Sequence, residues 1–172
     1  MESSLLTLLG ATILAYGPAY LANMAPPLAK GFKLPGESPI APTLLGTHKT
    51  YRGLAVGMVG GLVGAGMLRA LGWEWFGAQT WVVALSAGAL IGLAAMVGDA
   101  LKSGVKRAVG VKAGQPFVPW DQIDFILGSS LVMVPLGIVD WTMVVIALVI
   151  TPLLHLLVNI GAYLLGLKEV WW

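Results

Sequence analysis

Long runs of apolar residues fill most of this chain, and the polar residues are concentrated between them. Five runs are long enough to cross a lipid bilayer: 4–25, 53–71, 79–98, 122–139 and 142–166. A membrane-spanning helix needs about 20 mainly apolar residues, because the hydrocarbon core is about 30 Å thick and a helix rises about 1.5 Å per residue. The pattern predicts an all-α integral membrane protein with five transmembrane helices in a single membrane domain, 1–172.

The composition agrees with this prediction. Hydrophobic residues make up 58% of the chain and charged residues 10%, and the mean hydropathy is +0.86. These values exclude an ordinary soluble domain. The chain contains no cysteine, which excludes disulfide bonds and thiolate metal ligands.

The basic residues predict the orientation in the membrane. Most of them lie in two long connections, about 26–52 and 99–121, whereas Arg69 falls on the opposite side. Since cytoplasmic loops carry an excess of Lys and Arg, both connections are expected in the cytoplasm. The amino end is then outside and the carboxyl end, with Lys168, is cytoplasmic.

The first span and the connection after it contain several helix-breaking residues. Gly17-Pro18 predicts a kink, and Pro26-Pro27 predicts the end of the helix. Asn23, near that end, could hydrogen-bond either a ligand or a neighbouring helix. The connection itself is rich in proline and glycine and is expected to be a loop.

The end of this first loop is a candidate phosphate-binding element. Lys49, Thr50 and Arg52 bring two cations and a hydroxyl group to the start of the second span, next to His48, whose role the sequence leaves open. Helix amino ends and cations both attract anions. The alternative is that these cations only anchor the loop at the cytoplasmic surface.

The second connection holds most of the candidate chemistry. If the third helix continues past Gly98, its 100° periodicity places four polar residues on one side and Arg107 at the margin: Asp99, Lys102, Ser103 and Lys106. The two lysines repel each other at this spacing unless an anion lies between them. Gly98 weakens the helix with no packing role that the sequence reveals.

Two more acidic residues, Asp121 and Asp124, begin the fourth span on one helical face. They could serve structure alone, with Asp121 as the N-cap and Asp124 complementing the helix dipole. Facing a basic cluster, however, they are also suited to a divalent metal that joins carboxylates to phosphate oxygens.

Two spans carry further patterns. Glycines at four-residue spacing in the second span predict close helix packing, within one chain or in a homodimer, so the oligomeric state stays open. In the fifth span, Thr151, His155 and Asn159 form a polar stripe that predicts hydrogen bonds between helices. The same stripe could line a path, which makes a small transporter or channel the alternative function.

The polar residues of the second connection carry a resemblance to a known family. The pattern is Gly98-Asp99-x-x-Lys102-Ser103-x-x-Lys106-Arg107-x-x-Gly110, followed by Asp121-Gln122-x-Asp124-Phe125-x-x-Gly128. It resembles the archaeal CDP-archaeol synthases, which are related to the phosphatidate cytidylyltransferases. The chain length, the five expected spans and the element Lys49-Thr50-x-Arg52-Gly53 agree with this resemblance.

The resemblance implies a CTP-dependent nucleotidyltransferase of the cell membrane, with its active site at the cytoplasmic face. Its substrates would be CTP and a prenyl ether-lipid phosphate, unsaturated archaetidic acid, and its products CDP-archaeol and pyrophosphate. One or two Mg²⁺ ions would be held by Asp99, Asp121 and Asp124. The resemblance also implies that the phosphates are served by Lys102, Ser103, Lys106 and Arg107. The further substrate-binding candidates are Asn23, Lys49, Thr50, Arg52 and Gln122. No nucleic acid partner is expected.

The inventory of residues suits this chemistry independently. The second pKa of a phosphate monoester is near 6, so a lipid phosphate is already an anionic nucleophile at neutral pH. Its attack on a nucleotide phosphate needs no general base, but it does need positive charge to offset repulsion between the anions. Acids, cations and hydroxyl groups are what the two connections offer.

Overall fold

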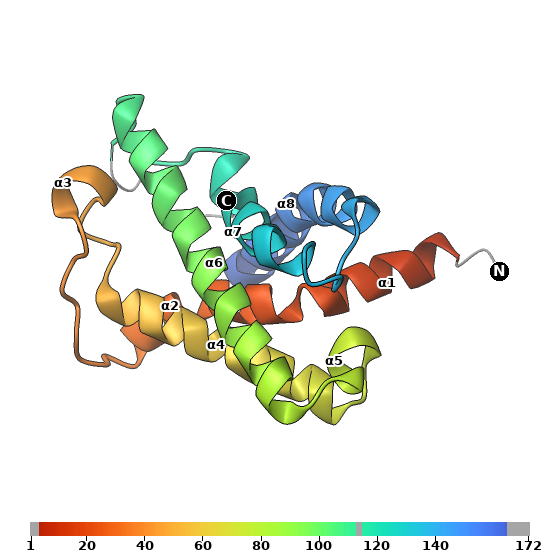
Figure 1. Ribbon diagram of the computed structural model, residues 1–172. Helices are drawn as coiled ribbons and strands as arrows, with labels where there is room; N and C mark the ends of the chain where they lie inside the picture. Colours follow the sequence, from red (N-terminus) through yellow and green to blue (C-terminus); the bar gives the residue numbers. More distant parts are fainter. Residues whose placement is uncertain (1–3, 113–114, 165–172) are drawn as a thin grey trace.

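The computed structural model describes residues 4–112 and 115–164, and within them the regular structure is helical (Figure 1). The helices are α1 (Leu5–Ala15), α2 (Gly17–Gly31), α3 (Pro42–Leu45), α4 (Tyr51–Ala70), α5 (Glu74–Ala78), α6 (Trp81–Ala108), α7 (Trp120–Met133) and α8 (Trp141–Leu164). A single β-bridge, between Pro39 and Thr50, is the only strand-like pairing in the described residues. The end of the fifth expected span, 165–166, and Lys168 lie outside the described residues.

Three described helices are long and apolar enough to cross a membrane: α4, α6 and the first 21 residues of α8. The pair α1 and α2 adds a fourth candidate if the two helices form one bent span. Five spans are therefore not confirmed. The expected fourth span, 122–139, contains only α7, whose 14 residues cover about 21 Å. Its apolar run continues, but the helix ends at Met133, and Pro135, two residues later, has no N–H group with which to continue the backbone hydrogen bonds.

The first expected span is bent where the sequence predicts a kink. The axes of α1 and α2 differ by 48°, with the break at Tyr16 immediately before Gly17-Pro18. The predicted helix end at Pro26-Pro27 is wrong, because α2 runs through both prolines to Gly31. Each proline removes one amide donor, but its fixed φ is compatible with a helix.

Helix α6 is longer than expected and crosses the whole molecule (Figure 1). It continues ten residues beyond 98 to Ala108, so the connection that follows runs only from 109 to 119. Helices α3 and α5 lie near its two opposite ends. The polar half of the predicted second connection, including Asp99 and Lys102, is therefore held on a helix and not on a loop.

The glycines of α4 allow two other helices to pack closely against it, as the sequence predicts. Gly60 and Gly64 face α2, whereas Gly61 faces α6. A Cβ atom on Gly61 would lie 2.3 Å from the carbonyl oxygen of Gly88. These glycine contacts are made within one chain.

Hydrogen bonds between helices connect the bent first span to the carboxyl half of the chain. The Tyr16 hydroxyl is 2.7 Å from Ser130 Oγ of α7, and the Tyr20 hydroxyl is 2.8 Å from Thr151 Oγ1 of α8. Thr151 is fully buried. The predicted interhelical hydrogen bonding of the polar stripe is therefore confirmed at Thr151.

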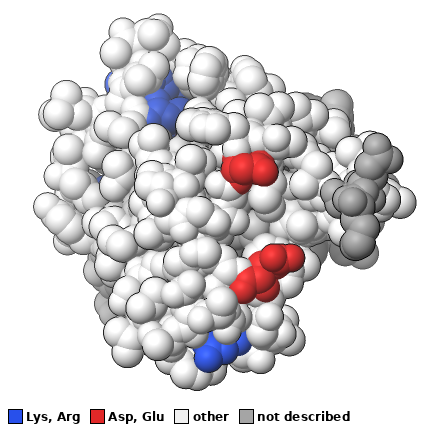
Figure 2. All heavy atoms as spheres, turned by 45° about the vertical axis from the view of Figure 1, so that its right-hand side comes forward, with Lys and Arg blue, Asp and Glu red and all other residues white. Residues whose placement is uncertain are grey.

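The outer surface of the helices is largely apolar. Figure 2 shows a face on which charged residues form only small, separate patches. Large hydrophobic side chains such as Leu6, Val82 and Leu131 are exposed on this kind of surface. Such an extended apolar exterior is what a lipid environment requires.

The α4–α6 contact generates a stability prediction. Replacing Gly61 by alanine should lower the unfolding free energy by about 1–3 kcal/mol, because the backbone of α6 cannot make room for a methyl group. Gly10→Ala is the matched control, since a Cβ there meets nothing within 4 Å. Thermal unfolding in detergent measures both variants, and equal melting temperatures would contradict the packing described here.

Candidate active site

The site begins with a glycine contact between α6 and α7. A Cβ atom on Gly98 would lie 2.5 Å from the carbonyl oxygen of Asp124, and one on Gly128 would lie 2.3 Å from that of Ala94. Only glycine at both positions allows the helices to approach this closely. The expectation that Gly98 has no packing role is wrong, because its backbone supports the helix next to Asp99.

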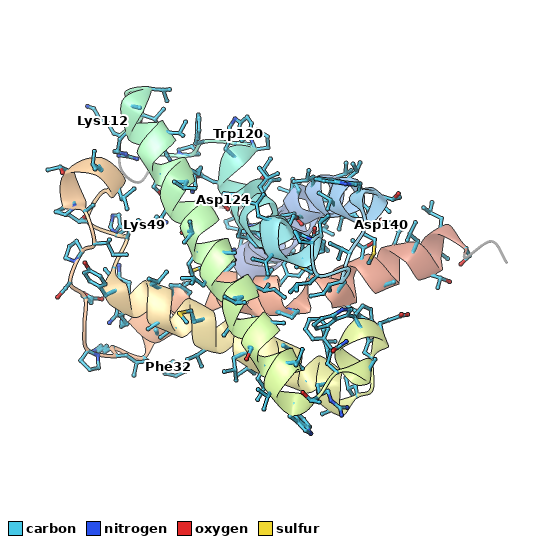
Figure 3. The ribbon with its side chains drawn as sticks, in the orientation of Figure 1. Phe32, Lys49, Lys112, Trp120, Asp124 and Asp140 are labelled. Atoms are coloured by element: carbon cyan, nitrogen blue, oxygen red, sulfur yellow. The ribbon has the colours of Figure 1, made fainter. Side chains whose placement is uncertain are left out.

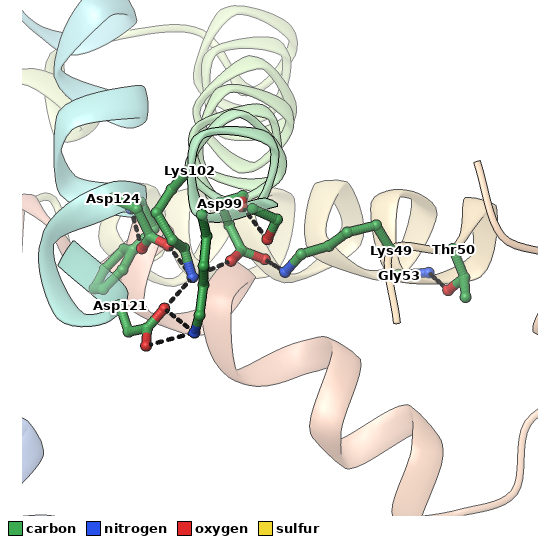
Figure 4. Close-up of polar contacts among 10 residues, drawn as sticks. Lys49, Thr50, Gly53, Asp99, Lys102, Asp121 and Asp124 are labelled. Carbon is green, nitrogen blue, oxygen red and sulfur yellow. Dashed lines mark hydrogen bonds and ion pairs between the residues drawn. The ribbon is translucent and has the colours of Figure 1, made fainter. Parts of the chain in front are cut away.

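Three carboxylates converge on one ammonium group at this contact (Figure 4). Lys102 Nζ lies 2.6 Å from Asp121 Oδ1, 3.0 Å from Asp124 Oδ2 and 3.2 Å from Asp99 Oδ1. Asp99 and Lys102 come from α6, and Asp121 and Asp124 from the first turns of α7. The structure thus brings together the three acids that the sequence predicts as metal ligands.

Two other lysines complete this cluster of acids and lysines. Lys49, from the end of the first loop, forms an ion pair with Asp99 Oδ2, and Lys106 Nζ lies 3.1 Å from Asp121 Oδ2. Figure 3 shows Lys49 beside α6, on the side where the first loop lies. Lys106 is only 7% exposed and Asp124 only 5%. Charges this far from water need partners, which the cluster provides.

Asp121 is oriented by the loop that precedes α7. The N-cap position is Pro119, so the alternative in which Asp121 is the N-cap is wrong. Its Oδ2 instead accepts a hydrogen bond of 2.6 Å from the backbone N–H of Phe117. Burial by itself would raise the pKa of Asp121, but hydrogen bonds from Lys102 and Lys106 outweigh it and lower the pKa below its usual value. The carboxylate is therefore ionised at neutral pH.

The donor chemistry of the cluster fits a hard divalent cation. All three acids present carboxylate oxygens, the ligands that Mg²⁺ prefers, and the buried Asp124 Oδ2 accepts no hydrogen bond. In the described part of the chain, however, no three acidic or histidine side chains form a ready-made metal site. The Lys102 ammonium lies among their oxygens, so a metal could enter only if Lys102 moved.

Two cavities adjoin the cluster of acids and lysines. The larger, about 680 Å³, lies between the end of α2, the first loop, the start of α4 and α6, and Asp99 forms part of its wall. Its lining combines polar residues with apolar side chains such as Met96 and Leu101. The smaller, about 140 Å³, is lined mainly by cationic and polar residues: His48, Lys49, Lys102, Ser103, Lys106 and Arg107.

The predicted residues of the first loop reach the larger cavity, but two of them also have structural partners. Thr50 Oγ1 accepts a hydrogen bond of 3.0 Å from Gly53 N–H and caps α4. Arg52 Nη2 lies 2.5 Å from Glu37 Oε1, and Nη1 donates a hydrogen bond to the carbonyl oxygen of Leu34. These two contacts hold the first loop against the start of α4. The sequence did not identify these loop contacts, since they join residues 15 and 18 positions apart.

The remaining predicted residues differ in their placement. Asn23 lines the larger cavity. Ser103 lines the smaller one, although its hydroxyl donates to the backbone oxygen of Asp99 over 2.9 Å. Gln122 is half-buried in the first turn of α7 and is not part of either cavity wall. His48, whose role was left open by the sequence, lines both cavities.

Comparison with known proteins identifies the family. The CarS-like model, described as CDP-archaeol synthase, matches residues 5–172. The chain belongs to the CDP-archaeol synthase family.

Individual relatives agree with the family model. The CDP-archaeol synthase of Aeropyrum pernix is 40% identical over 160 residues, covering 90% of this chain and 87% of the relative. That of Methanopyrus kandleri is 37% identical over 169 residues and covers 90% and 88% of the two chains. The resemblance found in the sequence is therefore confirmed, and so is the expected enzyme class, a CTP-dependent nucleotidyltransferase.

A solved structure supports the fold as well. An intramembrane enzyme for archaeal membrane lipid biosynthesis matches with a TM-score of 0.73 and 30% identity, over 86% of this chain and 92% of that chain. This similarity and the long apolar helices together indicate that this member of the CDP-archaeol synthase family is a multi-pass membrane protein.

The α6–α7 contact generates a prediction about activity. In Gly128→Ala the added methyl group should push α7 away from α6 and separate Asp124 from Asp99. A displacement of about 1 Å in a catalytic site can lower the rate about a hundredfold, and we expect a loss of this order in CDP-archaeol formation. Gly104→Ala, on α6, is the control, because the nearest contact of the added Cβ atom, Leu45 Cδ2, is at 3.6 Å. Full activity of Gly128→Ala would contradict this role.

Proposed function

We propose that the protein transfers the cytidylyl group of CTP to unsaturated archaetidic acid, giving CDP-archaeol and pyrophosphate. The observation that supports this best is the convergence of Asp99, Asp121 and Asp124 on one cation position, next to a basic cavity. Family membership supports the same reaction.

The reaction needs positive charge more than it needs a base. An oxygen of the lipid phosphate attacks the α-phosphorus of CTP, and the bond to the β-phosphate breaks as pyrophosphate leaves. Because the attacking phosphate is already anionic, no proton has to be removed from it. The barrier comes from repulsion between the two anions and from charge that develops on the leaving group.

The three acids of the cluster would hold one or two Mg²⁺ ions. When bound, the metal supplies positive charge to the reacting phosphates and to the leaving pyrophosphate. The residues that would hold it are Asp99, Asp121 and Asp124, whose oxygens already gather around a positive charge.

The cationic side chains bind and orient the phosphates in this proposal. Lys106 and Arg107 line the smaller cavity, and the buried Nε of Arg107 has no hydrogen-bond partner in the described protein. Lys49 lines both cavities, so its ammonium group can contact phosphates in either one. Thr50, Arg52 and Asn23 line the larger cavity, where the rest of the substrates would lie.

The transporter alternative is not favoured. The comparisons match a family of enzymes, and Thr151 of the polar stripe is already hydrogen-bonded to Tyr20. The charged residues gather toward one end of α6 instead of at mid-membrane depth, where a transport path usually carries them.

A substitution that preserves side-chain shape but removes a charge tests the metal assignment. Asp124→Asn keeps the shape of the side chain but removes one of the three negative charges, so we expect cytidylyl transfer at saturating Mg²⁺ to fall about 10²–10³-fold. Pyrophosphate release from CTP in detergent, with ether-lipid and ester-lipid phosphates compared and with or without EDTA, measures the loss.

Asp140→Asn is the matched control for this experiment. Asp140 caps α8 by accepting a hydrogen bond from Met143 N–H, a role that asparagine can also fill. Figure 3 shows Asp140 well away from Asp124. Wild-type turnover in Asp124→Asn, or an equal loss in both variants, would refute the assignment.

The proposed location of the site is the cytoplasmic face of the cell membrane, in a five-span topology with the amino end outside. The basic residues of the first loop and of α6 support this orientation. Each protomer could act alone or in a homodimer.

Single cysteines can test the orientation directly, because the chain has none of its own. Ser38→Cys in the first loop and Ala78→Cys at the end of α5 both place a thiol at an exposed position. A membrane-impermeant maleimide applied to intact cells should label only Ala78→Cys, and inside-out vesicles should give the opposite result. Labelling of Ser38→Cys in intact cells would reverse the proposed topology.

A further inference from the structure

Lys102 holds an unusual position for a residue expected to bind substrate. Its ammonium lies within 3.2 Å of an oxygen of each of three carboxylates, and its side chain is only 13% exposed. While its ammonium group contacts the three acids, it is not available to bind a phosphate. It occupies the place among the carboxylate oxygens where a cation binds most favourably.

The charge balance of the cluster depends on this lysine. Asp99 is also paired with Lys49, and Asp121 with Lys106. For Asp124, in contrast, Lys102 is the only ion-pair partner in the described residues. Asp124 Oδ2 accepts no hydrogen bond, so its interaction with Lys102 is the ion pair alone.

We propose that Lys102 is a resident cation, which a divalent metal displaces from the three carboxylates and which then becomes a phosphate ligand. This inference rests on the proposed function, since it requires the three acids to be the metal site. An ammonium and a divalent ion repel each other strongly at a separation of about 3 Å, so both cannot share the same oxygens.

The structure provides a place for the displaced side chain. Lys102 already forms part of the wall of the smaller cavity, together with Lys106 and Arg107. The lysine side chain has a flexible four-carbon stem, so its ammonium can leave the acids while its backbone stays in α6. With Lys49, four cationic side chains then face this small space, and the phosphates of CTP would neutralise them.

The exchange couples the two binding events. Before the metal enters, Lys102, together with Lys49 and Lys106, balances the charge of the three carboxylates, which stabilises the fold. When the metal enters, the displaced ammonium improves the phosphate site, so metal and CTP each strengthen the binding of the other. Lys102 thus links metal binding to nucleotide binding.

Metal affinity in the absence of CTP distinguishes this role from a purely structural one. In Lys102→Met no ammonium competes for the acids, so Mn²⁺, followed by its electron paramagnetic resonance signal, should bind about tenfold or more tightly than in the wild type. Lys112→Met is the matched control, because Lys112 lies exposed at the far end of the polar segment (Figure 3). The Lys102→Met variant should also transfer cytidylyl groups slowly and should lose the cooperativity between Mn²⁺ and CTP.

A measurement on the wild type covers the case in which Lys102→Met folds poorly. Amine acetylation, quantified residue by residue by mass spectrometry, reports how accessible each lysine is. Mg²⁺ alone should increase the labelling of Lys102 several-fold, and CTP added afterwards should decrease it again. Lys112 serves as the internal reference, and its labelling should stay constant.

The possible outcomes separate this inference from the proposed function. Equal Mn²⁺ affinity in the wild type and Lys102→Met, or unchanged labelling of Lys102 upon addition of Mg²⁺, would overturn the exchange but leave the metal site intact. Failure of both proteins to bind Mn²⁺ would overturn the metal site and the exchange together. Weaker Mn²⁺ binding in Lys102→Met would show that the lysine supports the acids instead of competing with the metal.

Discussion

The close contact between α6 and α7 is the constraint on which the rest of the site depends. Gly98 and Gly128 allow the two backbones to approach without side chains between them. Asp99 and Asp124 lie next to this contact, so the absence of two Cβ atoms brings carboxylates from distant parts of the chain to one place. Asp121 then reaches the same position from the turn before, held by the backbone of the preceding loop.

The electrostatic consequence is a dense polar cluster in an otherwise apolar protein. Three acids and three lysines lie close together, and their mutual pairing makes the burial of Lys106 and Asp124 tolerable. Such a cluster has little need of a histidine base when the nucleophile is a phosphate that is already ionised. In the proposed reaction, the charges are in place once metal and CTP are bound, and they do not need to reorganise as the reaction proceeds.

The apolar pattern predicted the helical character of the chain and, within a few residues, the described extents of α4 and α8 and the start of α6, but not the ten residues by which α6 continues past 98. Periodicity also predicted that Asp99, Lys102 and Lys106 share one side of α6. It failed where an apolar run does not correspond to one helix: the run over α7 continues across Pro135 and Gly137, whose φ is +67°. The prediction also failed at Pro26-Pro27, through which α2 continues. The sequence does not show whether the surrounding structure compensates for the two missing amide donors.

The sequence predicted which residues form the site, but not how they contact one another. Residue types and spacing pointed to the three acids, whereas the central position of Lys102 follows only from the way α6 and α7 pack. Gly98 appeared unfavourable in the sequence because its partner, Gly128, lies 30 residues away. The contacts of Arg52 with Glu37 and Leu34 could not be predicted either, because the sequence does not determine how this loop folds back on itself.

Anomalous X-ray scattering from crystals grown with Mn²⁺ and a non-hydrolysable CTP analogue would locate the metal relative to the three acids. We expect one or two peaks between α6 and α7, within about 2–2.5 Å of carboxylate oxygens of Asp99, Asp121 and Asp124. A metal bound elsewhere, with these three carboxylates still gathered around Lys102, would contradict this expectation.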